Sequence, residues 1–402
     1  MSRINGPFAA GLVVLSSLLA VSCGDGDRLT GSGSGTVAAA SNVAAVVVDS
    51  GPDPSNQPTV NTLYTTVTVC VPGSTTECQT IDHIQVDTQS YGLRILAPVL
   101  TLSLNVAPAP DGNSLLECTP FADGYSWGPV AMVDFTITGE AASGLPIQLI
   151  GDSRFPTAPT ACSAIGKAED TVAQFGANGI LGIGVFEQDC GSGCTAAQGV
   201  YYSCTQASCT ATTPTTQVLN PVPLFAKDND GTIIVLPTVP AAGAATVSGS
   251  LIFGIDTESN NASGTQTILT LDLNGEFTTM FNGVSLSTSI IDSGTNGIFF
   301  NDSSIPECSD AAGFYCPSST LSLSAILTGQ NGVSYNESFS IANADSLSSS
   351  NPTFTAQPML GGVFTSDSTT FDWGLPFFYG RRFATAVENQ TTAVATGPYM
   401  AF

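Results

Sequence analysis

The sequence predicts an all-β protein of two similar β lobes that face each other across a cleft. Only 10% of its 402 residues are charged and 41 are glycine, a composition that favours short strands joined by tight turns. Apolar runs of strand length follow one another without a regularly spaced helical pattern between them, which disfavours an α/β architecture. A short aspartate-containing stretch also occurs once in each half of the chain, which indicates a repeated folding unit.

The expected strands alternate in polarity or run apolar, and clusters of glycine, proline and asparagine separate them. Residues 61–71 (NTLYTTVTVCV) alternate, whereas residues 44–49 (AAVVVD) form a short apolar run. We expect the other strands at residues 80–86, 130–138, 147–150, 231–235, 247–255 and 267–273.

The repeat consists of residues 86–95 (VDTQSYGLRI) and 291–300 (IDSGTNGIFF). Each copy is followed later by an apolar segment around a glycine, at residues 178–184 (NGILGIG) and 373–378 (WGLPFF). Such a glycine lets another backbone approach closely. Two units of this kind, facing one another, would bring their aspartates together. The alternative is a chance similarity between two strand–turn units.

Paired aspartates suggest a specific chemistry. Two carboxyl groups within hydrogen-bond reach cannot both ionise easily, so they share a proton. One then acts as a base on a water molecule that attacks a peptide carbonyl, and the other protonates the carbonyl oxygen. Hydroxyl groups beside each aspartate can orient the carboxyls.

The two stretches resemble the paired D-T-G-S and D-[TS]-G-[TS] motifs of the pepsin-like aspartic proteases. Residues 179–182 (GILG) are similar to that family's glycine motif, residues 121–128 (FADGYSWG) to its flap hairpin, and residues 249–254 (GSLIFG) to the strand where its lobes join. The resemblance covers roughly residues 45–390 in pattern and implies a bilobal pepsin-like fold, although only the aspartate motifs are specific.

A closer resemblance is to a bacterial family of secreted proteins of unknown function and of about this length. The stretches that carry it are F-A-D-G-Y, F-G-A-N-G-I-L-G and F-D-W-G-L-P-F-F-Y-G-R.

Carried over to this sequence, the pepsin-like resemblance implies that Asp87 and Asp292 are the catalytic pair. Thr88 and Ser293 would connect the two turns. Ser90 and Thr295 would donate hydrogen bonds to the outer carboxylate oxygens. The flap residues would be Phe121, Gly124, Tyr125 and Trp127.

Two positions depart from the family pattern. Gln89 stands where the first motif has a glycine, whereas the second motif keeps Gly294. A glutamine adds a long polar side chain at a crowded point and would strain the turn if its backbone were glycine-like. Phe121 stands where the flap usually has a tyrosine, which removes a hydroxyl but keeps an aromatic wall.

The N-terminus is typical of an exported bacterial lipoprotein. Residues 1–22 read as a signal peptide whose apolar run is too short to span a bilayer, and Cys23 follows small residues as a lipidation site does. An ordinary cleaved signal peptide is the alternative. Residues 23–45 read as a flexible tether, and we place the two lobes at residues 46–250 and 251–402. We expect an outer-membrane anchor, with the periplasmic or surface face left open.

The other ten cysteines predict disulfides, because an exported chain folds under oxidising conditions. Cys70 with Cys78 and Cys308 with Cys316 would close short loops, and Cys118 with Cys162 is a further pair. The pairing within a final group stays open, and a zinc site is the alternative there: Cys190, Cys194, Cys204 and Cys209.

The charge excludes some partners. Eight basic residues stand against 32 acidic ones, so nucleic acids and anionic lipid surfaces would be repelled. We expect a monomer that meets a peptide or protein, contacts the membrane only through its lipid, and needs no cofactor or metal.

Other motifs are weaker. Residues 124–128 match the G-x-S-x-G pattern of serine hydrolases, but that motif needs a strand–turn–helix setting and a histidine after the serine. His83 precedes the serine. We interpret this histidine as a partly buried strand residue that lies too far along the strand to pair with Asp87. Residues 228–231 (DNDG) read as a hairpin turn rather than a calcium loop, since no bidentate glutamate follows at the required spacing.

The leading hypothesis is therefore an aspartic-type endopeptidase. The first alternative, motivated by Gln89, is a non-catalytic module that binds a peptide or glycan in the same cleft. The second is a disulfide-hardened structural protein of the envelope, for which the carboxyls of Asp87 and Asp292 should lie well apart.

Overall fold

The structure is a computed structural model that describes residues 41–402 except positions 123, 265 and 365–367. The predicted signal peptide, Cys23 and most of the predicted tether lie outside the described residues. Strands dominate, so the all-β prediction is confirmed. The helices of the described part are short: α1 (Thr160–Ser163), α2 (Val172–Phe175), α3 (Ala344–Ser350), η1 (Ala97–Val99), η2 (Gly191–Thr195), η3 (Val222–Leu224) and η4 (Leu375–Phe378). None of them is long and apolar enough to cross a membrane.

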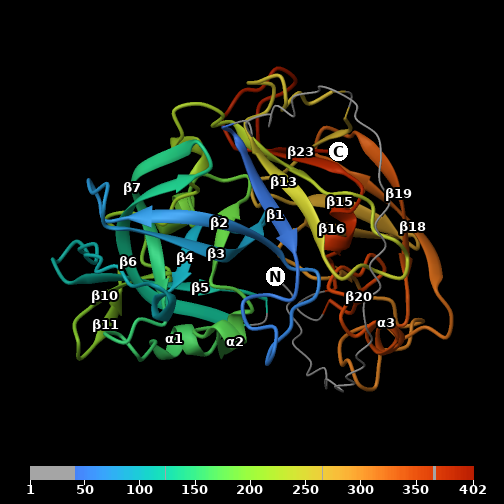
Figure 1. Ribbon diagram of the computed structural model, residues 1–402, viewed down its shortest axis with the longest axis horizontal. Helices are drawn as coiled ribbons and strands as arrows, with labels where there is room; N and C mark the ends of the chain where they lie inside the picture. The colour runs from blue at the N-terminus through green and yellow to red at the C-terminus, as the bar shows by residue number, and fades with distance from the viewer. Residues whose placement is uncertain (1–40, 123, 265, 365–367) are drawn as a thin grey trace, which may run out of the picture.

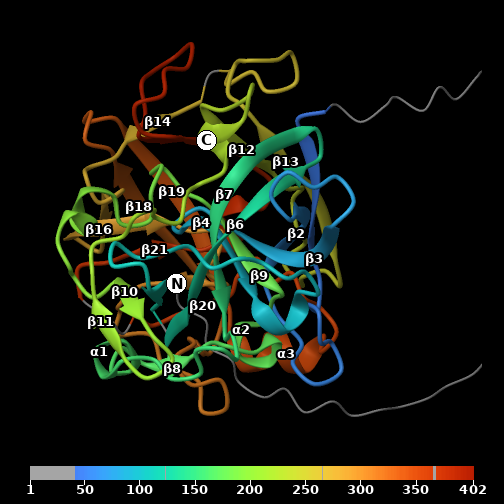
Figure 2. The same ribbon diagram turned by 90° about the vertical axis from the view of Figure 1, so that its left-hand side faces the viewer.

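Sixteen strands form one large sheet (Figures 1 and 2). Because β2 pairs with both β3 and β6, part of this sheet closes on itself like a barrel. In spatial order its strands are β11 (Cys209–Ala211), β10 (Tyr201–Cys204), β5 (Ser114–Pro120), β6 (Gly124–Ile137), β7 (Glu140–Ile150), β4 (Tyr91–Leu96), β9 (Gly179–Ile183), β3 (Cys78–Asp87), β2 (Leu63–Cys70), β1 (Val43–Val48), β13 (Val247–Phe253), β12 (Gly231–Val235), β22 (Arg382–Ala386), β23 (Tyr399–Ala401) and β14 (Ile268–Thr270), with β8 (Lys167–Ala168) paired to β6.

Seven strands form a second sheet (orange and red in Figure 1), on the opposite side of β1 and β13 from β2 to β7. In spatial order they are β19 (Ser334–Ile341), β18 (Leu321–Thr328), β15 (Phe277–Phe281), β16 (Val284–Ile291), β21 (Asp372–Trp373), β17 (Ile298–Phe299) and β20 (Gly361–Gly362).

Two expected boundaries differ from the observed elements. Strand β1 begins at Val43, inside the last residues assigned to the tether, because it pairs with β13 along its whole length. The expected division between residues 250 and 251 falls inside β13, which also pairs with β12. The C-terminal strands β22 and β23 return to the large sheet beside β12. Hydrogen bonding between distant segments, which sequence position does not reveal, sets these limits.

One arrangement of strands occurs in both sheets. Strand β9 lies parallel to β3 and antiparallel to β4, and β21 lies parallel to β16 and antiparallel to β17. In each case a strand from much later in the chain enters between the two strands that flank an aspartate turn. The repeat predicted from the sequence is therefore present as a repeat of topology.

The core continues beneath both aspartate turns. Val86, Leu181, Ile291 and Trp373 belong to one hydrophobic cluster and are fully buried. The Trp373 indole donates a hydrogen bond of 3.1 Å to Thr279 Oγ1, so its one polar atom is satisfied. This packing holds the strand ends that carry the aspartates.

Five disulfides are formed, which confirms the three predicted pairs and resolves the group left open. They are Cys70–Cys78, Cys118–Cys162, Cys190–Cys194, Cys204–Cys209 and Cys308–Cys316. The four cysteines considered as zinc ligands are thus bonded in two local pairs.

Candidate active site

The two aspartate turns are joined by hydrogen bonds across the interface between the sheets. Thr88 Oγ1 donates to the Ile291 carbonyl (3.0 Å) and accepts from the Ser293 N–H (3.0 Å). Ser293 Oγ donates to the Val86 carbonyl (2.9 Å). Thr88 and Ser293 therefore connect the turns, as the resemblance implied.

Glycines on the inserted strands make room for these turns. A Cβ atom on Gly182 would overlap the backbone of Ser90 and Tyr91. A Cβ atom on Gly374 would overlap the carbonyl oxygens of Thr295 and Gly297. The backbone expected to lie close to each glycine is thus the aspartate turn itself.

Asp87 and Asp292 lie together at the meeting point of the turns. The position that a Cβ atom would occupy on Gly294 is 2.5 Å from Asp87 Oδ2 and 3.0 Å from Asp292 Oδ1. Both carboxyls thus border the same small space beside Gly294, and both residues are fully buried. This geometry is contrary to the structural-protein hypothesis, which expected the two carboxyls well apart.

The two carboxyls receive different hydrogen bonds. Asp87 Oδ1 accepts from the N–H groups of Gln89 (2.6 Å) and Ser90 (2.9 Å). Asp292 Oδ1 accepts from the Gly294 N–H (2.7 Å), and its Oδ2 accepts from Thr295 Oγ1 (2.9 Å). Thr295 therefore has the expected role.

Ser90 does not have the expected role. Its hydroxyl oxygen is buried and has no hydrogen-bond partner in the described part of the chain. Only its backbone N–H contacts Asp87, because Asp87 Oδ1 takes two backbone donors in this turn. The expectation that both motif hydroxyls donate to outer carboxylate oxygens holds for one half only.

Burial makes the Asp87 carboxyl an unusually weak acid. Burial, and next the charge of Asp292, raise the pKa of Asp87 to about 8. At neutral pH the Asp87 carboxyl therefore holds its proton for most of the time. A pair with one proton between its two carboxyls can act as acid and base together.

Gln89 fits the turn without the backbone strain considered from the sequence. Its backbone does not adopt a positive φ, so a side chain is tolerated at this position. The side-chain amide donates to the Ile291 carbonyl at 3.3 Å, not to either carboxyl. Gln89 thus adds a further hydrogen bond between the turns, beside those of Thr88 and Ser293.

Three residues at the site were not predicted. Asp372 on β21 is fully buried, and its Oδ2 lies 3.0 Å from Thr295 Oγ1. Gln85, two residues before Asp87, donates to the Gly294 carbonyl (2.8 Å). Tyr91 lies close enough that, after burial, the charges of Asp87 and Asp292 raise its pKa. One signal was available, because Asp372 is a charged residue inside an otherwise apolar run.

The predicted flap hairpin is present as β5 and β6, with Phe121 donating to the Gly124 carbonyl (2.8 Å). The Phe121 ring packs against Phe175 with centroids 6.1 Å apart. Tyr125 and Trp127 instead pack with Cys118, Cys162 and Tyr202 in a separate cluster. A covering role over the carboxyls stays a prediction for the hairpin.

The serine-hydrolase pattern lies within strand β6, not on a strand–turn–helix. Ser126 is fully buried and donates to Gln148 Oε1 (2.7 Å). His83 is partly buried, and its ring nitrogens lie 3.3 Å from an Asp49 oxygen and 3.4 Å from an Asp82 oxygen. The His83 ring therefore contacts Asp49 and Asp82, and it pairs with neither Ser126 nor Asp87.

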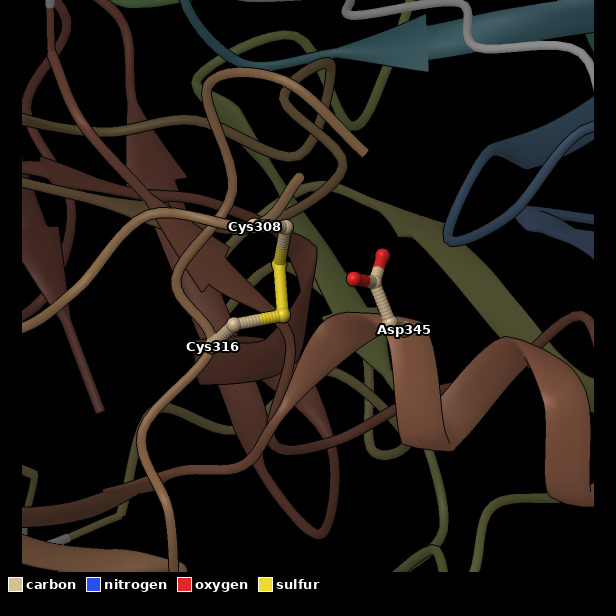
Figure 3. Close-up of side chains that lie close together, drawn as sticks. All are labelled: Cys308, Cys316 and Asp345. Carbon is tan, nitrogen blue, oxygen red and sulfur yellow. A yellow bond between two sulfur atoms is a disulfide. The ribbon is translucent and has the colours of Figure 1, made fainter. Parts of the chain in front are cut away.

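One group of potential metal ligands lies at the start of α3 (Figure 3). Cys308, Cys316 and Asp345 are within reach of a common point. The two sulfurs form a disulfide, however, and the thiolates that a metal would need are absent.

The fold and the site define a class of protein: an all-β protein in which two equivalent turns hold a buried aspartate pair. The chain belongs to the family described as "Protein of unknown function (DUF3443)", whose model matches residues 38–402. A comparison with curated proteins found no match.

Proposed function

We propose that the protein is an aspartic-type endopeptidase of pepsin-like architecture. The observation that carries this proposal is the meeting of Asp87 and Asp292 beside Gly294, at the ends of strands in equivalent positions. Hydrogen bonds from Thr88 and Ser293 fix the distance between the turns. Because both carboxyls are held, little reorganisation is needed before they act.

The pair performs both halves of a hydrolytic step. Its ionised carboxyl takes a proton from a water molecule, whose oxygen attacks the peptide carbonyl carbon. Its protonated carboxyl gives its proton to the carbonyl oxygen, which forms a neutral tetrahedral diol. Breakdown of this diol breaks the C–N bond, and the leaving amine takes a proton as the carboxylic acid product forms.

The proposed bilobal architecture is supported by the repeated topology. One lobe contains β3, β9 and β4, and the other contains β16, β21 and β17. The strands β1, β13, β12, β22, β23 and β14 would form the sheet at the junction of the lobes.

The test is peptide cleavage by the purified mature chain. We expect the wild type to cleave members of a peptide library at some pH between about 3 and 7, where one of two coupled carboxyls is ionised. Asp87→Asn and Asp292→Asn should each lower kcat/KM by at least about 100-fold, since each removes an acid–base group.

Asp310→Asn is the matched control, because Asp310 is exposed and should leave cleavage unchanged. Circular dichroism of each variant checks the fold. A wild type that cleaves nothing over this range, or an Asp87→Asn variant as active as the wild type, contradicts the proposal.

A second candidate function is capture of a peptide or glycan without hydrolysis, and the observation that favours it is Gln89 in place of the motif glycine. Its side chain lies at the carbonyl of Ile291, directly before Asp292. Retention of a ligand without turnover, together with a gain of cleavage in Gln89→Gly, would support this function. If the wild type cleaves peptides and Gln89→Gly is equally active, Gln89 does not impair catalysis, and the second candidate function loses its support.

We also propose export and anchoring through a lipid on Cys23. Five disulfides support folding in an oxidising compartment. On expression in a bacterium, the wild type should sediment with membranes and Cys23→Ala should not. Equal membrane association of both proteins contradicts the anchor.

A further inference from the structure

A third buried carboxyl lies behind the aspartate pair. Asp372 pairs across β21 and β16 with Ile290, two residues before Asp292. Thr295 Oγ1 stands between the two acids, 3.0 Å from Asp372 Oδ2 and 2.9 Å from Asp292 Oδ2. Asp372 Oδ1 is buried and has no hydrogen-bond partner in the described part of the chain.

The hydroxyl of Thr295 can donate a hydrogen bond to only one of the two acids at a time. A hydroxyl has one hydrogen to donate and can also accept. If Asp372 and Asp292 were both ionised, Thr295 could donate to only one of them, and two fully buried charges would lie close together. If Asp372 is neutral, its O–H donates to Thr295, whose O–H then donates to Asp292.

The charges nearby act in the same direction. Burial, followed by the charge of Asp292, raises the pKa of Asp372 well above its usual value. The charge of Asp87 raises this pKa further. Tyr91, the next ionisable group facing the pair, has its own pKa raised by burial and by the same aspartates.

The first motif has no equivalent of this chain of hydrogen bonds. Ile180 on β9 pairs with Gln85, two residues before Asp87, and so occupies the place that Asp372 has in the second motif. The hydroxyl of Ser90, the counterpart of Thr295, makes no hydrogen bond to Asp87.

The asymmetry favours the charge on one carboxyl. Both oxygens of Asp292 accept hydrogen bonds, whereas Asp87 Oδ2 has no donor among the described residues. Each carboxyl accepts two hydrogen bonds, but both donors of Asp87 are on Oδ1, so Asp87 Oδ2 is the one oxygen of the four that is left to carry a proton. The shared proton therefore belongs on Asp87.

We propose that Asp372 is a positioning residue that, as a neutral acid, donates through Thr295 to Asp292 and thereby makes Asp292 the base and Asp87 the acid of the pair. The assignment of base and acid rests on the proposed endopeptidase function. The placement of the protons does not, because it follows from the hydrogen bonds alone.

The test measures the protonation of each carboxyl directly. Protein labelled with ¹³C at the aspartate carboxyls is titrated by NMR, and single Asp→Asn variants assign the signals. At about pH 6 we expect Asp372 and Asp87 to be neutral and Asp292 to be ionised. An ionised Asp372, or an ionised Asp87 beside a protonated Asp292, overturns the proposal.

Two variants test the donation through Thr295. Asp372→Asn keeps a donor in the same shape and should leave the titration of Asp292 unchanged. Asp372→Ile copies Ile180 and removes the donor, so the titration midpoint of Asp292 should rise by about 0.5 to 1 pH unit. An unchanged midpoint in Asp372→Ile overturns the proposal; if that variant does not fold, the wild-type titration still decides it.

Kinetics then separates this inference from the proposed function. In an active enzyme the acidic limb of kcat/KM against pH reports the base of the free enzyme. It should move with the Asp292 midpoint in Asp372→Ile and stay in place in Asp372→Asn. If the wild type cleaves no peptide but its carboxyl signals are as expected, the endopeptidase function fails while the proton placement stands.

Discussion

Gly294 and Gln89 occupy equivalent positions in the two aspartate turns, yet only one of them tolerates a side chain. The space beside Gly294 is filled by carboxyl oxygens of Asp87 and Asp292. Gln89 extends its amide to the Ile291 carbonyl instead. The two halves of the site therefore have different packing despite their similar sequences.

Gly294→Ala should disrupt the pair. Its new methyl group would lie 2.5 Å from Asp87 Oδ2, so the turn must shift, at a cost of about 1–3 kcal/mol in the free energy of unfolding. Activity should fall as well. Urea unfolding and peptide cleavage measure the two effects.

Gly193→Ala is the control, because a Cβ atom there would meet only a sulfur at 3.8 Å. A Gly294→Ala protein with wild-type stability and activity would mean that the two turns can separate freely.

Residue type alone predicted part of the hydrogen bonding. Thr88 and Ser293 are placed as the resemblance implied, because a motif hydroxyl directly after the aspartate points to the opposite turn. Ser90 and Thr295 stand in the same register, but only the Thr295 hydroxyl hydrogen-bonds its carboxyl. The neighbours from the inserted strands also differ, with Asp372 in one half and Ile180 in the other.

At the level of elements, local patterns located strands well and their partners poorly. The expected strand at residues 231–235 coincides with β12, since apolar β-branched residues between turn residues specify a strand locally. Residues 373–378 are an apolar segment around a glycine. The structure has only Asp372–Trp373 as β21, and the 3-10 helix η4 follows, because Pro376 cannot donate to a sheet.

The disulfides differ in how much they stabilise their elements. Cys118–Cys162 joins β5 to α1 across 44 positions, whereas Cys190–Cys194 spans only 4. Loop-closure entropy predicts about 4 kcal/mol of stabilisation for the long loop and about 2 kcal/mol for the short one. Cys118→Ala/Cys162→Ala should therefore lower the urea midpoint more than Cys190→Ala/Cys194→Ala.

Urea unfolding of the two double variants under non-reducing conditions makes this comparison. Both sulfurs of the long-loop pair are buried, so their loss also removes packing in the same direction. An equal or reversed order would show that strain in the folded state outweighs loop entropy.

For the whole molecule, buried carboxyls predict stability that falls as the pH rises. Burial is the first cause of raised pKa values at Asp87, Asp189 and Asp372. The folded protein therefore keeps protons that the unfolded chain has lost. This stabilisation is fully present below the pKa values of the unfolded chain, near pH 4. It is lost as the pH rises through the pKa values of the folded protein, which for Asp87 is about 8.

Unfolding in urea between pH 4.5 and 8 should show this decline, with a slope of about 1.4 kcal/mol per pH unit for each extra proton held. Carboxyls with lowered pKa values, such as Asp152, exert their effect near and below pH 4 and do not oppose it. Asp87→Asn should flatten the slope. Stability that increases over this interval would mean that the buried carboxyls ionise in the folded protein.

The sequence by itself determined the all-β class, the positions of most strands, three of the disulfides and the aspartates that meet. These follow from local polarity patterns, short loops and a repeated motif. The tertiary structure decided the pairing of β22 and β23 with the large sheet, the different surroundings of Ser90 and Thr295, and the approach of Asp372 to Asp292. Each of these depends on segments far apart in the chain, which hydrogen bonding and packing bring together and which no local pattern records.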